Sequence, residues 1–347
     1  MTTSEPMSLE PCHAALMDRR RFLAGLSTLL GASAVAGPAL AASLNETAGT
    51  SAAGLPLRTL GRTGERITLL GLGTAPVGHS MPGAKAGVPV YQAALEAGIN
   101  YVDTARGYDD AEAYLGELMP RWRDRIFLVT KALPRGDDPR EAARAMQQSF
   151  EQSLRLLKTD HVDLLHIHNA GQNAPDLTLA SGGPLDFVRK MKDKGLTRFI
   201  GITGHSRVPH FVKIIETGEV DVLMVVLNFA DYHTYRFEES ILPVARRHQC
   251  GIIAMKVFGG HSRNFAGYRQ AGPAKMPAEL LEQSLRYSMG IAGVAGAVVG
   301  PYTADEVKQS VTWAKRYQPL SVAEGARLRE QGRKLAAAWG LRFGPAA

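Results

Sequence analysis

Cysteine is scarce in this sequence of 347 residues, which contains only Cys12 and Cys250. The two residues are far apart and form no CxxC pair or other metal-ligand spacing. An iron–sulfur cluster held by four cysteine thiolates is therefore excluded within one chain. Long runs of positive charge are also lacking, although the net charge is +7. Beyond Arg19-Arg20-Arg21 the basic residues are dispersed, so the sequence does not indicate nucleic-acid binding.

The N-terminus has no apolar run of membrane-spanning length. The run from Ala24 to about Ala36 is rich in Ala, Gly and Leu, whereas a span needs about 20 apolar residues. Arg19 and Arg20, one further residue and Phe-Leu precede this run, an order that resembles the twin-arginine export signal. Ala39-Leu40-Ala41 then offers a small-x-small cleavage site. We therefore predict a signal peptide over residues 1–41, read by the export machinery, with no permanent membrane anchor.

Cleavage at that site has consequences for the mature protein, which we expect to be periplasmic or secreted. Cys12 is removed with the signal peptide, so Cys250 remains alone and no internal disulfide can form. This composition is typical of a protein that is exported after folding, because such a protein needs no disulfides. Residues 42–54 are small and polar and are predicted to form a linker.

The rest of the chain alternates short apolar runs with stretches of helical periodicity. The runs are continuous rather than alternating, which indicates strands buried on both faces, as in a parallel sheet. The predicted strands are Ile67–Gly73, Ile99–Asp103, Ile126–Lys131, Val162–His168, Arg198–Thr203, Val220–Leu227, Gly251–Lys256 and Val294–Val299. Predicted helices between and after them include Pro89–Ala97, Pro139–Leu157, Pro184–Lys194, Val208–Thr217, Glu238–His248, Pro277–Ser288 and Thr303–Tyr317. This order predicts a closed (β/α)8 barrel.

An open, doubly wound α/β sheet is the alternative architecture. It would carry a GxGxxG phosphate-binding turn after its first strand. Gly71-Leu72-Gly73 begins such a turn, but Pro76 stands at the third glycine position. The barrel is therefore favoured. We predict that it occupies residues 55–340, with a hairpin over residues 55–66 and an additional C-terminal helix over residues 321–338.

Active sites of (β/α)8 barrels lie at the C-terminal ends of the strands. Several reactive side chains fall at these ends, namely Asp103, Tyr108, Lys131, His166, His168, His205, Asn228 and Lys256. Buried charges are costly unless they are paired, so stability alone does not explain this set.

One combination within this set makes chemical sense. A lysine beside a tyrosine favours the phenolate and lowers the pKa of the phenol. An aspartate paired with that lysine holds it in place, and a histidine orients a carbonyl oxygen. The tyrosine can then act as general acid towards a carbonyl that is being reduced by hydride.

Three segments of the sequence resemble the aldo/keto reductase family. Asp103-Thr-Ala-Arg-Gly-Tyr108, followed by Glu112, Leu115 and Gly116, is similar to its DTAxxYxxxxxxxG signature. Val-Thr-Lys131 is similar to its strand-3 lysine, and Val162-Asp163-Leu-Leu-His-Ile-His168 to its strand-4 DLxxxH segment. The resemblance covers about residues 55–315. It implies that the catalytic residues are Asp103, Tyr108, Lys131 and His168.

The resemblance also implies NADP as cofactor. The predicted cofactor-binding residues are Thr203, Asn228, Met255, Lys256, Gly300, Thr303 and Lys308. The sequence departs from the family pattern at several positions: Gly204 cannot supply the usual amide, and Met255 replaces the tyrosine that stacks on nicotinamide. Glu306 stands where the family has basic residues that grip the 2′-phosphate, and a carboxylate there would repel it. NAD is therefore possible as well.

The preferred function is an NAD(P)-dependent oxidoreductase that reduces an aldehyde, ketone or sugar carbonyl, or oxidises the alcohol, without a metal. One alternative is a nucleotide-binding sensor or partner protein that no longer turns over, since the amide and stacking positions are altered. A second alternative is a metal-dependent barrel hydrolase that uses His166 and His168, which share one face of a strand. Further histidines, His205, His233 and His261, lie on later loops.

Overall fold

The computed structural model describes residues 49–80, 83–260 and 276–347, and these residues form one compact unit. The predicted signal peptide and most of the predicted linker lie outside the described residues. Residues 49–54, at the end of that linker, form a hydrogen-bonded turn in which the Thr50 backbone bridges to Pro56. Within the described ranges, every helix is too short or too polar to cross a membrane.

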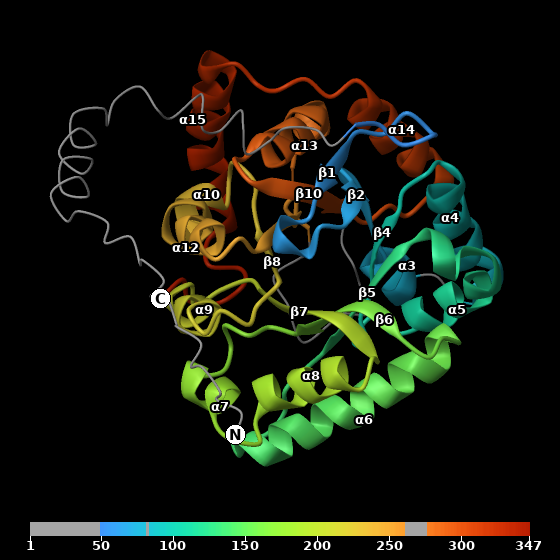
Figure 1. The fold of residues 1–347 in the computed structure, drawn as a ribbon. Coiled ribbons are helices and arrows are strands. Elements are labelled where there is room, and N and C mark those ends of the chain that lie inside the picture. Colours follow the sequence, from blue (N-terminus) through green and yellow to red (C-terminus); the bar gives the residue numbers. More distant parts are fainter. Residues whose placement is uncertain (1–48, 81–82, 261–275) are drawn as a thin grey trace, which may run out of the picture. The chain divides into compact units, whose positions relative to one another are not determined.

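A closed barrel of eight parallel strands forms the centre of the described chain (Figure 1), and this confirms the predicted fold. In order around the barrel, the strands are β3 (Leu70–Gly73), β4 (Tyr101–Asp103), β5 (Phe127–Ala132), β6 (Val162–Ile167), β7 (Thr197–Gly204), β8 (Val222–Val226), β9 (Gly251–Met255) and β10 (Val294–Val299). β10 pairs with β3 and closes the ring. All residues of β5, β6, β8, β9 and β10 are buried. Side chains fill the barrel and helices cover it, which explains the continuous apolar runs.

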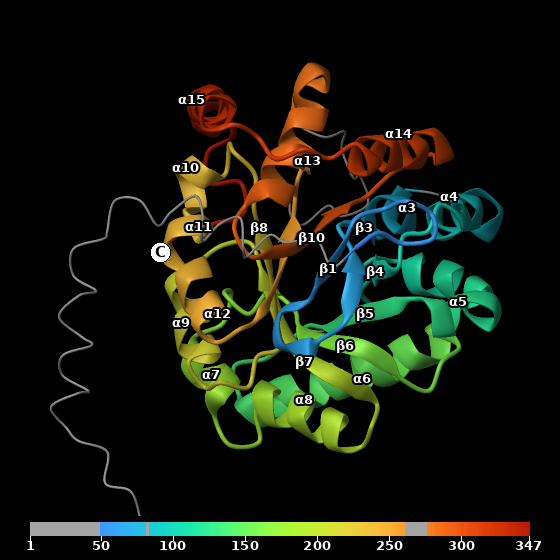
Figure 2. The same ribbon diagram turned by 45° about the horizontal axis from the view of Figure 1, so that its top comes forward.

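Helices surround the strands, as Figure 2 shows from a second direction. The longer ones are α4 (Ala84–Glu96), α5 (Ala111–Trp122), α6 (Pro139–Leu157), α8 (Pro184–Asp193), α13 (Leu281–Gly290), α14 (Ala304–Lys315) and α15 (Val322–Trp339). Shorter ones are α3 (Ala75–Ser80), α7 (Pro175–Leu179), α9 (Pro209–Ile215), α10 (Tyr232–Tyr235), α11 (Phe237–Ser240) and α12 (Leu242–Arg247). Local sequence sets several starts: Asp138 caps α6 with Pro139 in its first turn, and Ser321 and Glu324 form a capping box on α15.

Two predicted elements are divided in the structure. The apolar run Ile67–Gly73 contributes β2 (Arg66–Thr68) to an antiparallel hairpin with β1 (Leu57–Thr59), and only its second half enters the barrel as β3. The division falls at Leu69, whose N–H donates to the Pro56 carbonyl of the hairpin. The predicted helix Glu238–His248 is split into α11 and α12 because Pro243, in the first turn of α12, has no N–H to continue the preceding helix.

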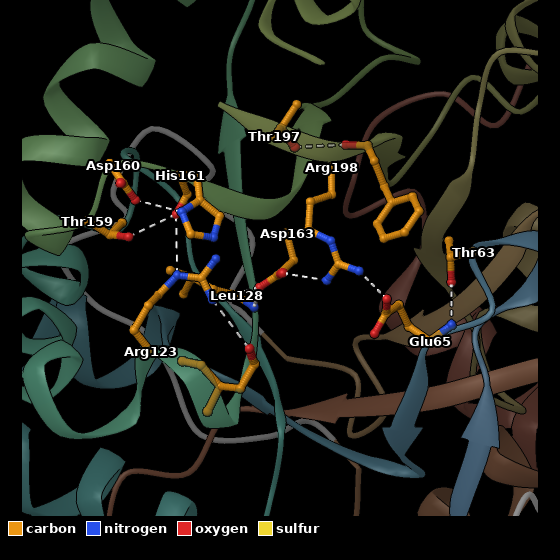
Figure 3. A network of polar contacts seen from close by, with 12 residues as sticks. Thr63, Glu65, Arg123, Leu128, Thr159, Asp160, His161, Asp163, Thr197 and Arg198 are labelled. Atoms are coloured by element: carbon orange, nitrogen blue, oxygen red, sulfur yellow. Dashed lines mark hydrogen bonds and ion pairs between the residues drawn. The ribbon is translucent and has the colours of Figure 1, made fainter. Parts of the chain in front are cut away.

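A network of polar and ionic contacts joins the N-terminal parts of β5, β6 and β7 (Figure 3). Asp163, near the start of β6, is its centre. One carboxylate oxygen accepts hydrogen bonds from the Leu128 N–H at 2.8 Å and from Arg123 at 3.0 Å, and the other accepts from Arg198 at 2.9 Å. Arg198 also pairs with Glu65, beside the hairpin. Asp163 therefore links β5, β6, β7 and the hairpin.

The last residues of the chain pack back onto the barrel. Arg342 forms a buried ion pair with Asp231, which follows β8. The Phe343 N–H donates to the Tyr235 hydroxyl at 2.8 Å, and the Val208 N–H donates to the carbonyl of Ala346. The barrel unit thus extends beyond residue 340, the predicted boundary.

Candidate active site

The four predicted catalytic residues come together at the C-terminal ends of adjacent strands. Asp103 ends β4, Tyr108 lies between β4 and α5, Lys131 lies near the end of β5, and His168 directly follows β6. Lys131 connects the group. Its Nζ donates to Asp103 Oδ2 at 2.7 Å, to the carbonyl oxygen of Thr104 at 2.8 Å, and to the Tyr108 hydroxyl oxygen at 3.1 Å.

Backbone hydrogen bonds fix two of these positions. The Tyr108 N–H donates to the Ala105 carbonyl at 3.0 Å, and the Tyr108 carbonyl accepts from Ala111 N–H, the first residue of α5. Tyr108 is thus held in a tight turn just before the helix. The N–H of His168 donates to the Ala132 carbonyl at 2.9 Å, which extends the pairing of β5 and β6 by one residue. The tyrosine and histidine rings are 6.0 Å apart and nearly perpendicular.

Two other residues of the Asp103–Gly116 signature have structural roles. Buried Glu112 accepts hydrogen bonds from Thr130 at 2.7 Å and from Arg106 at 2.9 Å. Glu112 therefore anchors the residue that precedes Lys131. Gly116 permits the close approach of α5 to α6, because a Cβ atom there would lie 2.0 Å from the Leu156 carbonyl oxygen.

Burial governs the ionisation of the site. It raises the pKa of Asp103 and lowers that of Lys131, and the contact between the two opposes both shifts. Burial, followed by the Asp103 charge, raises the pKa of Tyr108 well above its usual value. The net pKa of Tyr108 is therefore raised, whereas the lysine by itself would lower it. Lys131 is paired with Asp103 at 2.7 Å, and the Asp103 charge opposes ionisation of the phenol.

The hydrogen bonds of Lys131 also decide where the tyrosine proton can go. An ammonium group has three N–H donors, and all three are used on Asp103, Thr104 and Tyr108. The phenol oxygen is an acceptor in its contact with Lys131, so its own hydrogen can be donated to a ligand. Burial and the Lys131 charge lower the pKa of His168 well below its usual value, so its imidazole is neutral. A protonated phenol and a neutral imidazole are suited to polarise a carbonyl oxygen.

A cavity opens beside this group. Of the described residues, those that line it are Gly73, Thr74, Ala75, Pro76, Asp103, Tyr108, His205, Met224, Met255, Lys256, Val257, Phe258, Gly260, Val298, Val299, Gly300 and Tyr302. They come from β3, β4, β8, β9 and β10 and from the segments that follow β3, β4, β7, β9 and β10. Three predicted cofactor-binding residues, Met255, Lys256 and Gly300, are among them.

Two further predicted cofactor-binding residues do not line the cavity but contact residues that do, Met255 and Lys256. Thr203, buried in β7, donates its hydroxyl hydrogen to Met255 Sδ at 3.8 Å and so fixes that side chain. Asn228 is fully buried, and both its amide nitrogen and its amide oxygen form hydrogen bonds with protein groups. Its Nδ2 donates to Asp231 and to the Lys256 carbonyl, while its Oδ1 accepts from the N–H groups of Ala230 and Asp231. In this structure Asn228 therefore organises the loop after β8.

The remaining two predicted cofactor-binding residues, Thr303 and Lys308, lie in the first turns of α14 or just before it. Thr303 caps the helix by accepting from the Glu306 N–H at 3.2 Å. The Glu306 carboxylate accepts in turn from the Tyr302 N–H at 2.6 Å, so it sits over the N-terminus of the helix. Lys308 is largely exposed and pairs with Asp305. The structure does not bring Lys308 to the cavity lining described above.

Two of the histidines that would serve a hydrolase contact separate protein groups. Nδ1 of His205 lies 3.0 Å from the Asn169 side-chain oxygen, and Nε2 of His233 lies 2.6 Å from the Arg329 carbonyl on α15. His166 is fully buried inside the barrel, and burial lowers its pKa well below the usual value. His261 lies outside the described residues. Within the described ranges, no three histidine, cysteine or acidic side chains are placed to hold a metal ion.

Some site residues had no sequence signal. Thr104 acts through its backbone carbonyl, which any residue could supply. Arg342 and Asp231 are 111 positions apart, yet they form a buried ion pair next to Asn228. Tyr302 also lines the cavity, although no motif in the sequence assigns it a role.

The barrel and its tyrosine–lysine–aspartate–histidine group are those of a carbonyl oxidoreductase. The model of the aldo/keto reductase family matches residues 69–326, so the chain belongs to this family and is an NAD(P)-dependent oxidoreductase. An uncharacterized oxidoreductase of Bacillus subtilis, YqkF, is 26% identical over 73% of this chain and 89% of its own length. L-galactose dehydrogenase of Arabidopsis thaliana is 25% identical over 77% of this chain and 91% of its own.

A solved structure shares the fold. The aldo-keto reductase of Klebsiella pneumoniae in complex with NADPH superposes with a TM-score of 0.62 at 22% identity, covering 79% of this chain and 95% of the other.

Proposed function

We propose that this protein reduces an aldehyde, ketone or sugar carbonyl with NADPH, or oxidises the corresponding alcohol, and that Tyr108 is the general acid. One observation carries the proposal: Lys131 donates to the Tyr108 oxygen at 3.1 Å, at the edge of a cavity that Tyr108 itself lines. The phenol hydrogen is then available to a carbonyl oxygen in the cavity. Neutral His168 completes the polar surroundings of that oxygen.

The residues of the cavity fit a nicotinamide nucleotide. When bound, the nucleotide supplies the hydride. The Met255 thioether, held by Thr203, offers a polarizable surface to a flat ring. Lys256 offers an ammonium group, and Gly300 lines the cavity just after β10. The NADPH complex of the Klebsiella relative supports the choice of nucleotide.

The test is to titrate the purified protein with NADPH and NADH by intrinsic fluorescence, and then to follow nucleotide oxidation with a panel of carbonyl compounds. We expect saturable binding and carbonyl-dependent oxidation. Absence of binding by well-folded protein would remove the reductase proposal. Binding without any turnover across a broad panel would instead favour the sensor alternative.

Glu306 is expected to weaken NADPH relative to NADH. Its carboxylate lies over the N-terminus of α14, where a 2′-phosphate would otherwise meet backbone N–H groups. Glu306→Gln keeps an acceptor for the Tyr302 N–H but removes the charge. We expect the Kd of NADPH to fall about two- to five-fold, the size of an exposed charge interaction, with the Kd of NADH unchanged. Asp305→Asn, an exposed acid in the same turn, is the matched control, and equal effects on both nucleotides would contradict the prediction.

We further propose that the chain is exported by the twin-arginine route, a proposal supported by the sequence of residues 1–41. Replacing Arg19 and Arg20 together by lysine keeps the charge but removes the arginine pair. We expect the protein to remain in the cytoplasmic fraction of a bacterium that has this pathway, as measured by fractionation and immunoblotting. Arg21→Lys is the control and should be exported normally. Unchanged export of the double variant would refute the assignment.

A further inference from the structure

Lys256 occupies a fixed position in the cavity wall. It directly follows β9 and has a φ of 57°, a left-handed conformation that is unusual for lysine. Its carbonyl accepts hydrogen bonds from Asn228 Nδ2 at 2.9 Å and from the Gly259 N–H at 2.8 Å. These bonds hold the backbone in place, and the side chain lines the cavity together with Asp103 and Tyr108.

The ammonium group of Lys256 is unpaired among the described residues. Its Nζ makes no hydrogen bond or ion pair there and lies over the ring of Phe343, 6.0 Å from the ring centroid. Lys131, in the same site, uses all three of its donors on protein acceptors. The Lys256 side chain is only partly buried and lines the cavity, so a bound anion can reach its ammonium group and accept a charge-assisted hydrogen bond from it.

The surrounding charges leave Lys256 as the excess cation. Three cations, Lys131, Lys256 and Arg342, and two carboxylates, Asp103 and Asp231, influence one another here. Each carboxylate is engaged by another cation, Asp103 by Lys131 at 2.7 Å and Asp231 by Arg342. Counting the described residues, this corner of the cavity therefore carries one uncompensated positive charge.

The same charges determine how Lys256 titrates. Burial, then the charges of Arg342 and Lys131, lower the pKa of Lys256 to about 8, and the two carboxylates oppose this shift. Lys256 remains mostly protonated at neutral pH. It also acts on the pKa of His168 and of Asp103, which places its charge at the catalytic end of the cavity.

We propose that Lys256 makes the active-site cavity an anion subsite, which holds a carboxylate or phosphate oxygen of a bound molecule beside the catalytic group. This inference rests on the proposed function where it concerns the substrate. The substrate class is then a carbonyl compound that carries a carboxylate. A phosphate of the nucleotide has the same anionic chemistry and is the second source.

The primary test uses equilibrium binding and needs no turnover. The full chain and its Lys256→Met and Lys256→Arg variants are titrated calorimetrically with benzoate and with neutral benzamide of the same shape. We expect Lys256→Met to lose roughly 10- to 100-fold in benzoate affinity, the range of a charge-assisted hydrogen bond. Lys256→Arg should retain most of the benzoate affinity, and the affinity for benzamide should be the same in all three proteins. Circular dichroism melting curves confirm that the variants are folded.

A second arm distinguishes the two sources of the anion. NADPH is titrated into the same proteins. Loss of benzoate affinity with normal NADPH affinity assigns the subsite to the substrate carboxylate, while loss of NADPH affinity with normal benzoate affinity assigns it to the nucleotide phosphate. Unchanged affinity for both anions in Lys256→Met would overturn the proposal. Because none of these readouts depends on catalysis, an inactive enzyme would count against the proposed function alone.

The pH dependence provides an independent check. An anion that binds Lys256 raises its pKa, so binding near pH 8 takes up protons. In the wild type we expect benzoate affinity to fall above pH 8 and the calorimetric heat to depend on the buffer. Lys256→Met should lose both effects. A buffer dependence that survives in Lys256→Met would assign the proton to another group of the site and contradict this part of the proposal.

Discussion

Replacement of Tyr108 by phenylalanine is expected to abolish carbonyl-dependent oxidation of the nucleotide while leaving nucleotide binding intact. The substitution removes one oxygen atom, which accepts from Lys131 at 3.1 Å and carries the only hydrogen that we assign to the carbonyl. General acid catalysis by a positioned side chain contributes about 10²- to 10⁴-fold. We therefore expect kcat to fall by roughly that factor, measured by nucleotide absorbance at saturating carbonyl compound.

The phenylalanine variant is a clean test because the ring contacts persist. The ring of Tyr108 lies 6.0 Å from that of His168 and 5.7 Å from that of His79, and both contacts are made by its carbon framework. Tyr114→Phe is the matched control. Tyr114 is on α5, and its hydroxyl donates to Asp110 at 3.3 Å. Normal turnover by Tyr108→Phe would show that the proton comes from another group and would refute the assignment.

The raised pKa of Tyr108 adds a prediction about pH. Burial keeps the phenol protonated across the neutral and moderately alkaline range. Ionisation of Tyr108 therefore should not limit carbonyl reduction there. The same feature corrects the simplest view of the site, in which a nearby lysine makes the tyrosine more acidic. The structure instead pairs Lys131 with Asp103 and preserves a neutral hydrogen-bond donor.

The barrel could be predicted from the sequence because its strands differ from its helices in pattern. A strand buried on both faces gives a continuous apolar run, and β5, β6 and β10 lie within such runs. The apolar pattern could not show where, within one continuous run, the chain stops pairing with one strand and begins to pair with another. Thr68 and Leu70 are both buried and both extended, yet the first pairs with the hairpin and the second with β10.

The catalytic group could be predicted because its members lie in motifs at strand ends, and topology brings strand ends together. The roles of buried polar residues were less accessible. Asn228 reads from the sequence as a ligand-binding amide, but the structure satisfies that amide with Asp231 and the Lys256 carbonyl. The isolation of Lys256 depends on Arg342 engaging Asp231, a contact between distant segments. Local sequence carries no record of such a pairing.

Replacement of Asp163 by asparagine is expected to lower the free energy of unfolding by about 3 kcal/mol, a large effect for one isosteric change. The Asp163 side chain is 6% exposed, and Arg123 beside it is 14% exposed. Without the carboxylate, Arg123 becomes a poorly solvated and uncompensated cation. Arg198 is 45% exposed, so water screens its interaction with Asp163. The expected loss of unfolding free energy therefore lies at the lower end of the range for broken buried ion pairs.

Urea denaturation followed by circular dichroism measures this effect, with Asp160→Asn as the matched control. Asp160 is 93% exposed and only three positions away, so its replacement should leave the urea midpoint nearly unchanged. A midpoint for Asp163→Asn equal to that of the control would show that the network contributes nothing measurable. Measuring the activity of the folded Asp163→Asn variant distinguishes a role in stability from a role in catalysis. Asp163 lies at the N-terminal end of β6 and His168 at its C-terminal end, so folded Asp163→Asn should keep its kcat, because stability and chemistry are placed at opposite ends of the same strand.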